Sequence, residues 1–196
     1  MSKNIVKNQV TDRIILGIDP GTNILGYGII AVKGGTLKVL AMDVFRMEKL
    51  EDHMLKLKYI FEHTLQLIDE YKPDELSVEA PFFGKNVQSM LKLGRAQGVA
   101  IAAGLYRSVP IFEYSPRKIK QSITGNGNAS KEQVAAMLRQ MYSIKKMPAL
   151  LDATDGLAAA VCHYNQGVPA AGASRQKKYS GWETFIKDNP ARTSKP

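Results

Sequence analysis

Four carboxylates, drawn from three separated segments, are the residues of this sequence best suited to chemistry. Asp19 closes an apolar run, Glu79 closes another, and Asp152 and Asp155 lie in a third apolar stretch. A spacing of three places Asp152 and Asp155 on one helix face, with Cβ atoms about 5–6 Å apart. No histidine or cysteine accompanies the four acids, and all-oxygen ligation suits the hard ions Mg²⁺ and Mn²⁺. Two such ions, about 3.5–4 Å apart, can split a phosphodiester.

Each acid also has a purely structural interpretation. Asp19 precedes Pro-Gly, where turn aspartates are common, and Glu79 is equally consistent with the exposed tip of a strand. Asp152 as the helix N-cap, with Asp155 in the first turn, is favoured by the helix dipole. That alternative does not explain why the surrounding helix is almost wholly apolar. The pattern therefore predicts a buried helix facing a sheet, where two acids call for a cation.

The elements that must position these acids alternate between strand and helix. Residues 13–19, 26–32 and 36–45 read as three strands, and Gly34-Gly35 between the last two is a hairpin signal. Further strands are expected at 75–79 and 110–114, with helices at about 51–71, 86–107, 131–142 and 151–165. This order predicts an α/β fold, a mixed five-stranded sheet flanked by helices, in which ligands gather at the strand ends.

The composition favours a polyanionic partner. The 196 residues carry 27 Lys and Arg against 18 Asp and Glu, a net charge of +9. Such an excess most often indicates nucleic acid. With Cys162 as its single cysteine, the chain forms no internal disulfide, which indicates a reducing compartment.

The chain divides by composition into three parts. We expect an N-terminal extension at 1–12, one folded domain at 13–167, and a basic tail at 168–196. The tail is interpreted as flexible, with a basic arm touching DNA or a partner as the alternative. The apolar stretch 99–106 is too short to cross a membrane, and the first ten residues lack the apolar core of a signal peptide. We therefore expect a cytoplasmic protein with no membrane partner.

Two glycine patterns add to this picture. In the loop at 125–131, Ser130 and Gln133 form a capping box, and Lys131 adds a cation at a helix start. The Walker spacing is absent, so a DNA-backbone contact is favoured over a nucleotide site. Gly94 and Gly98 cost helix stability, which close helix packing would explain. The apolar stretch beside them suits either the core or a dimer interface.

Several motifs, in this order and spacing, resemble the RuvC family of Holliday junction resolvases, the crossover junction endodeoxyribonucleases. The resemblance covers about residues 14–165. The motifs are GIDPGT at 17–22, GYG at 26–28, Glu79, KLGRAQGVAI at 92–101, YSPRKIKQ at 114–121 and DATDGLA at 152–158.

The resemblance implies an RNase H-like fold and a homodimer that resolves four-way DNA junctions by paired, symmetric cuts during recombination and repair. It implies 5′-phosphate and 3′-hydroxyl ends and two Mg²⁺ ions per active site, with Mn²⁺ as a substitute. The catalytic, metal-holding acids of the family fall on Asp19, Glu79, Asp152 and Asp155. A branch-migration helicase of the RuvA and RuvB type is the implied partner.

The resemblance also implies DNA contacts. The aromatic residue at the strand exchange point falls on Phe82, although the adjacent Phe83 could take that place. Stacking on an unpaired base would contribute about 1–3 kcal/mol. The basic residues near the scissile phosphate fall on Lys120 and Lys131, and Arg117 belongs to the same basic set. Without the resemblance, each lysine would be interpreted as a solvated surface charge.

Two other functions compete with this interpretation. The Asp-x-Gly-Thr turn also opens the phosphate site of sugar-kinase and actin-like ATPases, but this chain is too short for their two domains. A non-catalytic junction-binding protein on the same fold is the second. Four clustered acids argue against it, because negative charge facing DNA weakens binding.

Overall fold

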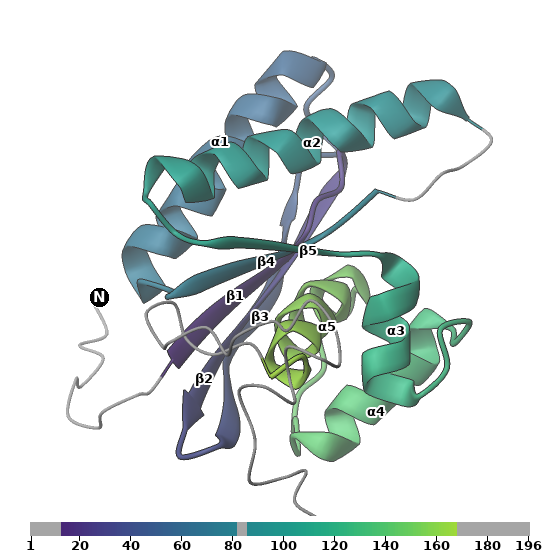
Figure 1. Cartoon of the computed structure of the whole chain (residues 1–196). Helices are drawn as coiled ribbons and strands as arrows, with labels where there is room; N and C mark the ends of the chain where they lie inside the picture. Colours follow the sequence, from purple (N-terminus) through teal and green to yellow (C-terminus); the bar gives the residue numbers. More distant parts are fainter. Residues whose placement is uncertain (1–12, 82–85, 168–196) are drawn as a thin grey trace, which may run out of the picture.

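The computed structural model describes residues 13–81 and 86–167. The predicted extension 1–12, the predicted tail 168–196, and Phe82 and Phe83 lie outside the described residues. The described chain forms a five-stranded sheet in the order β3-β2-β1-β4-β5, with helices on both faces (Figure 1). The predicted mixed sheet flanked by helices is confirmed.

The sheet is antiparallel on one side and parallel on the other. Its strands are β1 (Arg13–Asp19), β2 (Ile24–Lys33), β3 (Thr36–Arg46), β4 (Glu75–Glu79) and β5 (Ile111–Tyr114). The first three strands form the predicted meander, whereas β4 and β5 run parallel to β1. Asp19 pairs with Gly26, and Val78 pairs with Ile18, so Asp19 and Glu79 end neighbouring strands at one end of the sheet.

Four of the five described helices were predicted from the sequence. These are α1 (His53–Tyr71), α2 (Val87–Tyr106), α4 (Lys131–Met141) and α5 (Asp152–Asn165). The unpredicted helix, α3 (Pro116–Thr124), has start and stop signals in the sequence: Ser115 caps it, Pro116 is its first residue, and left-handed Gly125 ends it. No helix of the described ranges is long and apolar enough to cross a membrane.

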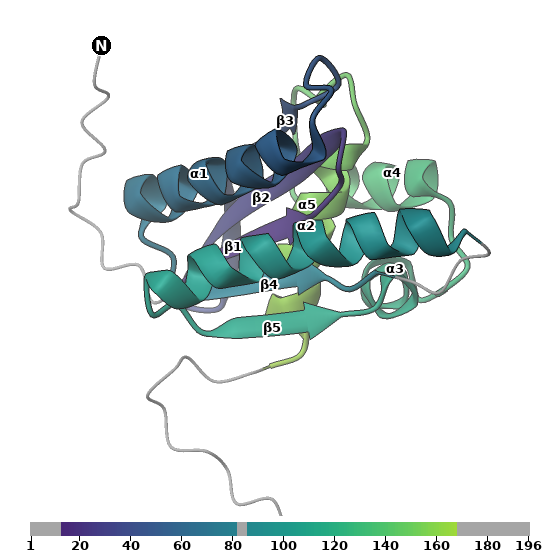
Figure 2. The same ribbon diagram turned by 90° about the horizontal axis from the view of Figure 1, so that it is seen from above.

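Different helices cover the two faces of the sheet. Helices α1 and α2 pack on one face, and α5 lies against the other with α3 and α4 beyond it (Figures 1 and 2). The α1–α2 side has a core of large aliphatic side chains, including Leu16, Ile18 and Ile60. The α5 side instead contains a run of alanines at 158–160.

Helix α5 is buried, as its apolar sequence predicts, and it touches the strands through backbone atoms. A Cβ atom at Gly26 would lie 1.8 Å from the carbonyl oxygen of Asp152. A Cβ at Gly156 would lie 2.5 Å from the Cα of Tyr27. The depth of the helix against the sheet is therefore set by main-chain contact at its first turns, where Asp152 sits.

A buried polar network ties α5 to the opposite end of the sheet. Glu75 and His163 are both fully buried, and the Nε2 of His163 lies 3.0 Å from Oε2 of Glu75. The Nε of Arg13 lies 3.2 Å from the same oxygen, and the Tyr114 hydroxyl is 2.7 Å from Nδ1 of His163. No sequence pattern predicts this network. It holds the start of β1 to the end of α5, at the far end from Asp19.

Candidate active site

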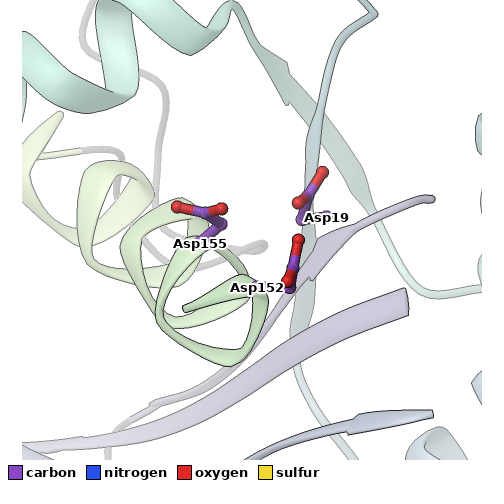
Figure 3. A group of neighbouring side chains, drawn as sticks. All are labelled: Asp19, Asp152 and Asp155. Atoms are coloured by element: carbon purple, nitrogen blue, oxygen red, sulfur yellow. The ribbon is translucent and has the colours of Figure 1, made fainter. Parts of the chain in front are cut away.

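Three aspartates meet where β1 ends and α5 begins. Asp19 is the last residue of β1, and Asp152 and Asp155 occupy the first turn of α5. Their side chains gather about one space in Figure 3. One carboxylate oxygen of each lies within 4.8 Å of one from each of the others. Two segments more than a hundred residues apart in sequence thus contribute to one acidic group.

Glu79 lines the same site. It lines a hollow of about 190 Å³ together with Asp19 and Lys131. It also lines an adjoining hollow of about 150 Å³ with Asp155, Lys120 and Lys131. Glu79 lies outside the compact group of three aspartates, but it faces the same charges.

Burial and mutual repulsion disfavour the charged forms of these acids. Burial, followed by the charge of Asp155, raises the pKa of Asp19 to about 7. Burial, followed by the charge of Asp19, raises the pKa of Glu79 to about 8. The pKa of Asp155 is also raised, chiefly by burial. Three neighbouring acids with raised pKa values form a site at which a cation is stabilised.

Lys131 supplies a positive charge within the acid cluster. Its Nζ contacts Oδ2 of Asp155 and lies 3.5 Å from Oδ1 of Asp152. Burial acts to lower its pKa, but the hydrogen bond and charge of Asp155 outweigh burial and raise it. Lys131 is therefore a counter-ion of the cluster, which differs from the solvated surface charge that the sequence alone favoured.

The other predicted DNA contacts are distributed unevenly. Lys120 lines the hollow beside Glu79. Arg117 is exposed and packs against the glycine-rich loop, because a Cβ at Gly127 would lie 2.6 Å from its Cγ. It does not line either hollow at the acids.

The structural alternative that made Asp152 an N-cap is wrong, and the predicted capping box is confirmed. Asp152 is the first helical residue of α5 rather than its N-cap, and no side chain caps this helix. For Gly94 and Gly98 the sequence left both the core and a dimer interface open; beyond the backbone of α2 itself, no described atom lies within 4 Å of a Cβ built at either position, so core packing does not account for these glycines. The capping box of Ser130 and Gln133 is present at the start of α4.

The donor set fits a hard divalent cation. Carboxylate oxygens are the ligands that Mg²⁺ and Mn²⁺ prefer. Three of the acids place a carboxylate oxygen within 4.8 Å of the others, and a lysine already compensates part of their charge. An RNase H-like mixed sheet with such a cluster at the end of its first strand defines a class of protein, the metal-dependent nucleases of this fold.

Comparison with known proteins identifies the family within that class. The family model described as "Crossover junction endodeoxyribonuclease RuvC" matches residues 15–163. The chain belongs to the RuvC family of crossover junction endodeoxyribonucleases. This result supports the predicted nuclease and decides against the ATPase alternative.

Relatives and solved structures agree with this assignment. The chain is 60% identical to a RuvC of Christiangramia forsetii over 98% of this chain and 99% of that protein. It is 58% identical to one of Bacteroides fragilis, covering 93% and 97%. The structure of Thermus thermophilus RuvC in complex with a Holliday junction substrate matches with a TM-score of 0.73 at 31% identity, covering 79% of this chain and 94% of that one. The yeast mitochondrial Holliday junction resolvase Ydc2, at 15% identity, shares the fold, with a TM-score of 0.57 and coverage of 79% and 78%.

Proposed function

We propose that this chain is a structure-selective endonuclease that resolves four-way DNA junctions by paired, symmetric, metal-dependent hydrolysis during recombination and repair. The observation that carries the proposal is the cluster of Asp19, Asp152 and Asp155, with Glu79 beside it, in a chain of the RuvC family. The net charge of +9 suits a DNA substrate. Cleavage leaves 5′-phosphate and 3′-hydroxyl ends in this proposal.

Asp19, Glu79, Asp152 and Asp155 are the residues that would hold two Mg²⁺ ions, with Mn²⁺ as a substitute. Such a pair activates the attacking water and stabilises the leaving oxygen. The support is the all-carboxylate donor set and the raised pKa values of Asp19 and Glu79. Main-chain contact between α5 and β2 fixes the two aspartates of α5 relative to Asp19.

The lysines around the acids bind and orient the phosphate in this proposal. Lys131 compensates the acids in the free protein, and its ammonium would hold a DNA phosphate if a divalent cation took over that compensation. Lys120, across the hollow from Asp155, offers a second positive charge. Arg117 contacts the backbone further away, and Phe82 or Phe83 stacks on an unpaired base, as the family resemblance implies.

A two-fold homodimer supplies the two cuts that a junction requires, since one active site cuts one strand. The exposed face of α2 suits this role: Leu91 and Leu105 are 52% and 61% exposed, and a Cβ at Gly98 meets open space. Val99 and Ile101, expected to add apolar surface, are packed in part against their own core. A branch-migration helicase of the RuvA and RuvB type and a cytoplasmic location complete the proposal.

Mapping of cuts on defined DNA tests this function. A synthetic mobile four-way junction and a duplex of the same sequence are incubated with the protein, with and without Mg²⁺. We expect symmetric nicks in two opposed strands of the junction, with Mg²⁺ only, and an intact duplex. Tight binding without cleavage under all metal conditions would establish the non-catalytic alternative instead.

A further inference from the structure

A cavity of about 610 Å³ lies beside the acid cluster, toward the β3 edge of the sheet. One wall is the last part of β3, the other is the segment 146–150 that leads into α5, and Tyr59 of α1 also lines it. In Figure 2 the connection before α5 runs next to the loop that follows β3. The function proposed above makes no use of this cavity.

The cavity adjoins the site where the DNA strand is cut. Arg46 at the end of β3 pairs with Ile24, while Asp19 pairs with Gly26 on the other side of β2. The end of β3 and Asp19 therefore lie at the same end of the sheet, about 10 Å apart, which is two strand spacings. The second wall ends only two residues before Asp152. A strand held at the acids thus brings a neighbouring nucleotide to the cavity.

The charges of the lining suit a phosphate. Arg46 and Lys146 are exposed and form no ion pair with another residue of the described ranges. Asp43 is the single acid of the lining, and its Oδ1 accepts the N–H of Val44 at 2.8 Å. The lining therefore has two side-chain cations without an ion pair in the described ranges, and one carboxylate that already accepts a hydrogen bond from its own strand.

The remaining lining is mostly apolar. The ring of Phe45 is stacked between those of Tyr27 and His63, with centroid distances of 5.1 and 4.1 Å. Its faces are covered, so it contributes a fixed edge to the wall. Met147 and Pro148 line the other side. A flat, apolar group such as a nucleobase fits between walls of this kind.

We propose that this cavity receives one nucleotide of the cut strand, adjacent to the scissile phosphate, with its phosphate at Arg46 and Lys146 and its base against Phe45 and Met147. The proposal rests on the proposed function. A base at a junction is the easiest to accommodate, because extrusion costs least where pairing is already broken. Since one wall leads directly into Asp152, the fit of the nucleotide influences the acid cluster, and Arg46 and Lys146 are residues that position the cut strand.

The phosphate contact is tested on junctions in which one phosphate at a time, moving away from the cut, is replaced by a neutral methylphosphonate. At one position, the replacement should weaken binding of the junction to the wild-type protein about fivefold to tenfold. The Lys146→Ala variant should bind the unmodified junction more weakly by the same factor. The methylphosphonate at the sensitive position should not weaken its binding further. Lys38→Ala, at the opposite end of β3, should keep the full sensitivity. Wild-type sensitivity at every position in both Lys146→Ala and Arg46→Ala would overturn the proposal.

The base contact is tested by filling the cavity. Ala149→Phe places a ring in it, and Ala136→Phe fills a separate hollow of about 460 Å³ on α4 as the matched control. An abasic site at the position found above should slow cutting about tenfold in the wild type and in Ala136→Phe. Ala149→Phe should be slow on the intact junction and insensitive to the abasic site.

The two proposals fail in different ways. If the wild type does not cut the unmodified junction, the proposed function is wrong. If it cuts but no phosphate or base position depends on the cavity variants, only the cavity proposal is wrong. Thermal melts establish that each variant is folded, and if Ala149→Phe is not, the methylphosphonate comparison decides alone.

Discussion

The two faces of the sheet are built with different kinds of contact. Helix α5 meets β1 and β2 through glycine and alanine, so that main chain lies on main chain. Helices α1 and α2 meet the other face through large aliphatic side chains, and α2 leaves Leu105 and Tyr106 exposed. All four candidate catalytic acids lie at the end of the sheet from which α5 starts.

The two faces therefore differ in how far their helices can shift relative to the sheet. Side chains in a core can change rotamer, whereas two backbones in contact cannot approach or slide without steric overlap. A helix held in this way carries Asp152 and Asp155 at a fixed depth relative to Asp19. The α2 face has no such constraint and is free to serve as a surface for association.

The largest effect is expected from removing one acid on the α5 side. Asp19→Asn or Glu79→Gln should lower junction cleavage by more than about a hundredfold, because a carboxylate that we propose holds metal is lost. Junction binding should stay equal or become tighter, since negative charge near phosphate is removed. Glu62→Gln on α1 is the matched control and should cut normally. Retained cleavage in Asp19→Asn or Glu79→Gln would remove these acids from the mechanism.

The stability of the metal-free protein should fall as pH rises from about 5 to about 8. The pKa values of Asp19 and Glu79 are raised to about 7 and about 8, so in this interval the folded state binds more protons than the unfolded state. Each such carboxyl contributes up to about 1.4 kcal/mol per pH unit. Denaturant titrations in EDTA measure the slope, and Asp19→Asn should flatten it. A flat wild-type profile would show that burial and the neighbouring charges do not raise the pKa values of these acids.

Adding one methyl group to each face sharpens the contrast. Gly26→Ala places a Cβ 1.8 Å from the carbonyl oxygen of Asp152, and should destabilise the protein by about 1–3 kcal/mol while slowing cleavage. Gly94→Ala meets open space inside a helix and should stabilise it by about 0.4–1 kcal/mol. Urea denaturation measures both. Equal changes in the free energy of unfolding would mean that the two faces tolerate an added methyl group equally well.

The α2 face is tested with a bulkier side chain. Gly98→Leu should leave the monomer folded, because nothing lies within 4 Å of its Cβ, and should weaken dimerisation by about 1–3 kcal/mol through overpacking. Light scattering reports the mass, and a junction carried on supercoiled plasmid reports whether the two nicks are coupled. If Gly98→Leu unfolds the protein, the interface must be sought elsewhere.

The smallest effect concerns salt. The logarithm of junction affinity should fall linearly with the logarithm of salt concentration, by about 0.9 per neutralised phosphate. Lys120→Ala, next to the acids, should lower the magnitude of this slope by about one. Lys58→Ala on α1 should leave it unchanged. An unchanged slope in Lys120→Ala would mean that Lys120 contacts no phosphate and is an ordinary solvated surface charge.

Local sequence patterns were sufficient for most of the fold. Short apolar runs and the Gly34-Gly35 turn predicted all five strands, and apolar stripes with stop signals predicted four of the helices. These features are encoded within a few residues. Helix α3 was missed because it is only nine residues long and its buried face holds just two apolar residues, Ile119 and Ile123, although Ser115-Pro116 and Gly125 mark its ends. A rule based on caps rather than on periodicity would have found it.

The four acids could be selected from the sequence as candidates, but their counter-charge could not. Asp19, Glu79, Asp152 and Asp155 stand out because each interrupts an apolar segment. Lys131 follows a polar loop, as many surface lysines do, so its contact with Asp155 depends on how α4 packs against α5. The buried pair of Glu75 and His163 and the cavity beside β3 likewise depend on segments that only tertiary structure brings together.

The network around Glu75 has a practical consequence for experiments on immobilised protein. Arg13, next to the start of the described chain, and His163, close to its end, share one carboxylate oxygen. Tyr164 also donates to the carbonyl of Gly35 in the β2–β3 turn, so the end of α5 lies at the end of the sheet remote from Asp19. A surface tether or fluorophore attached near residue 167 therefore starts on the side away from the acids, a suitable geometry for watching single junctions being cut.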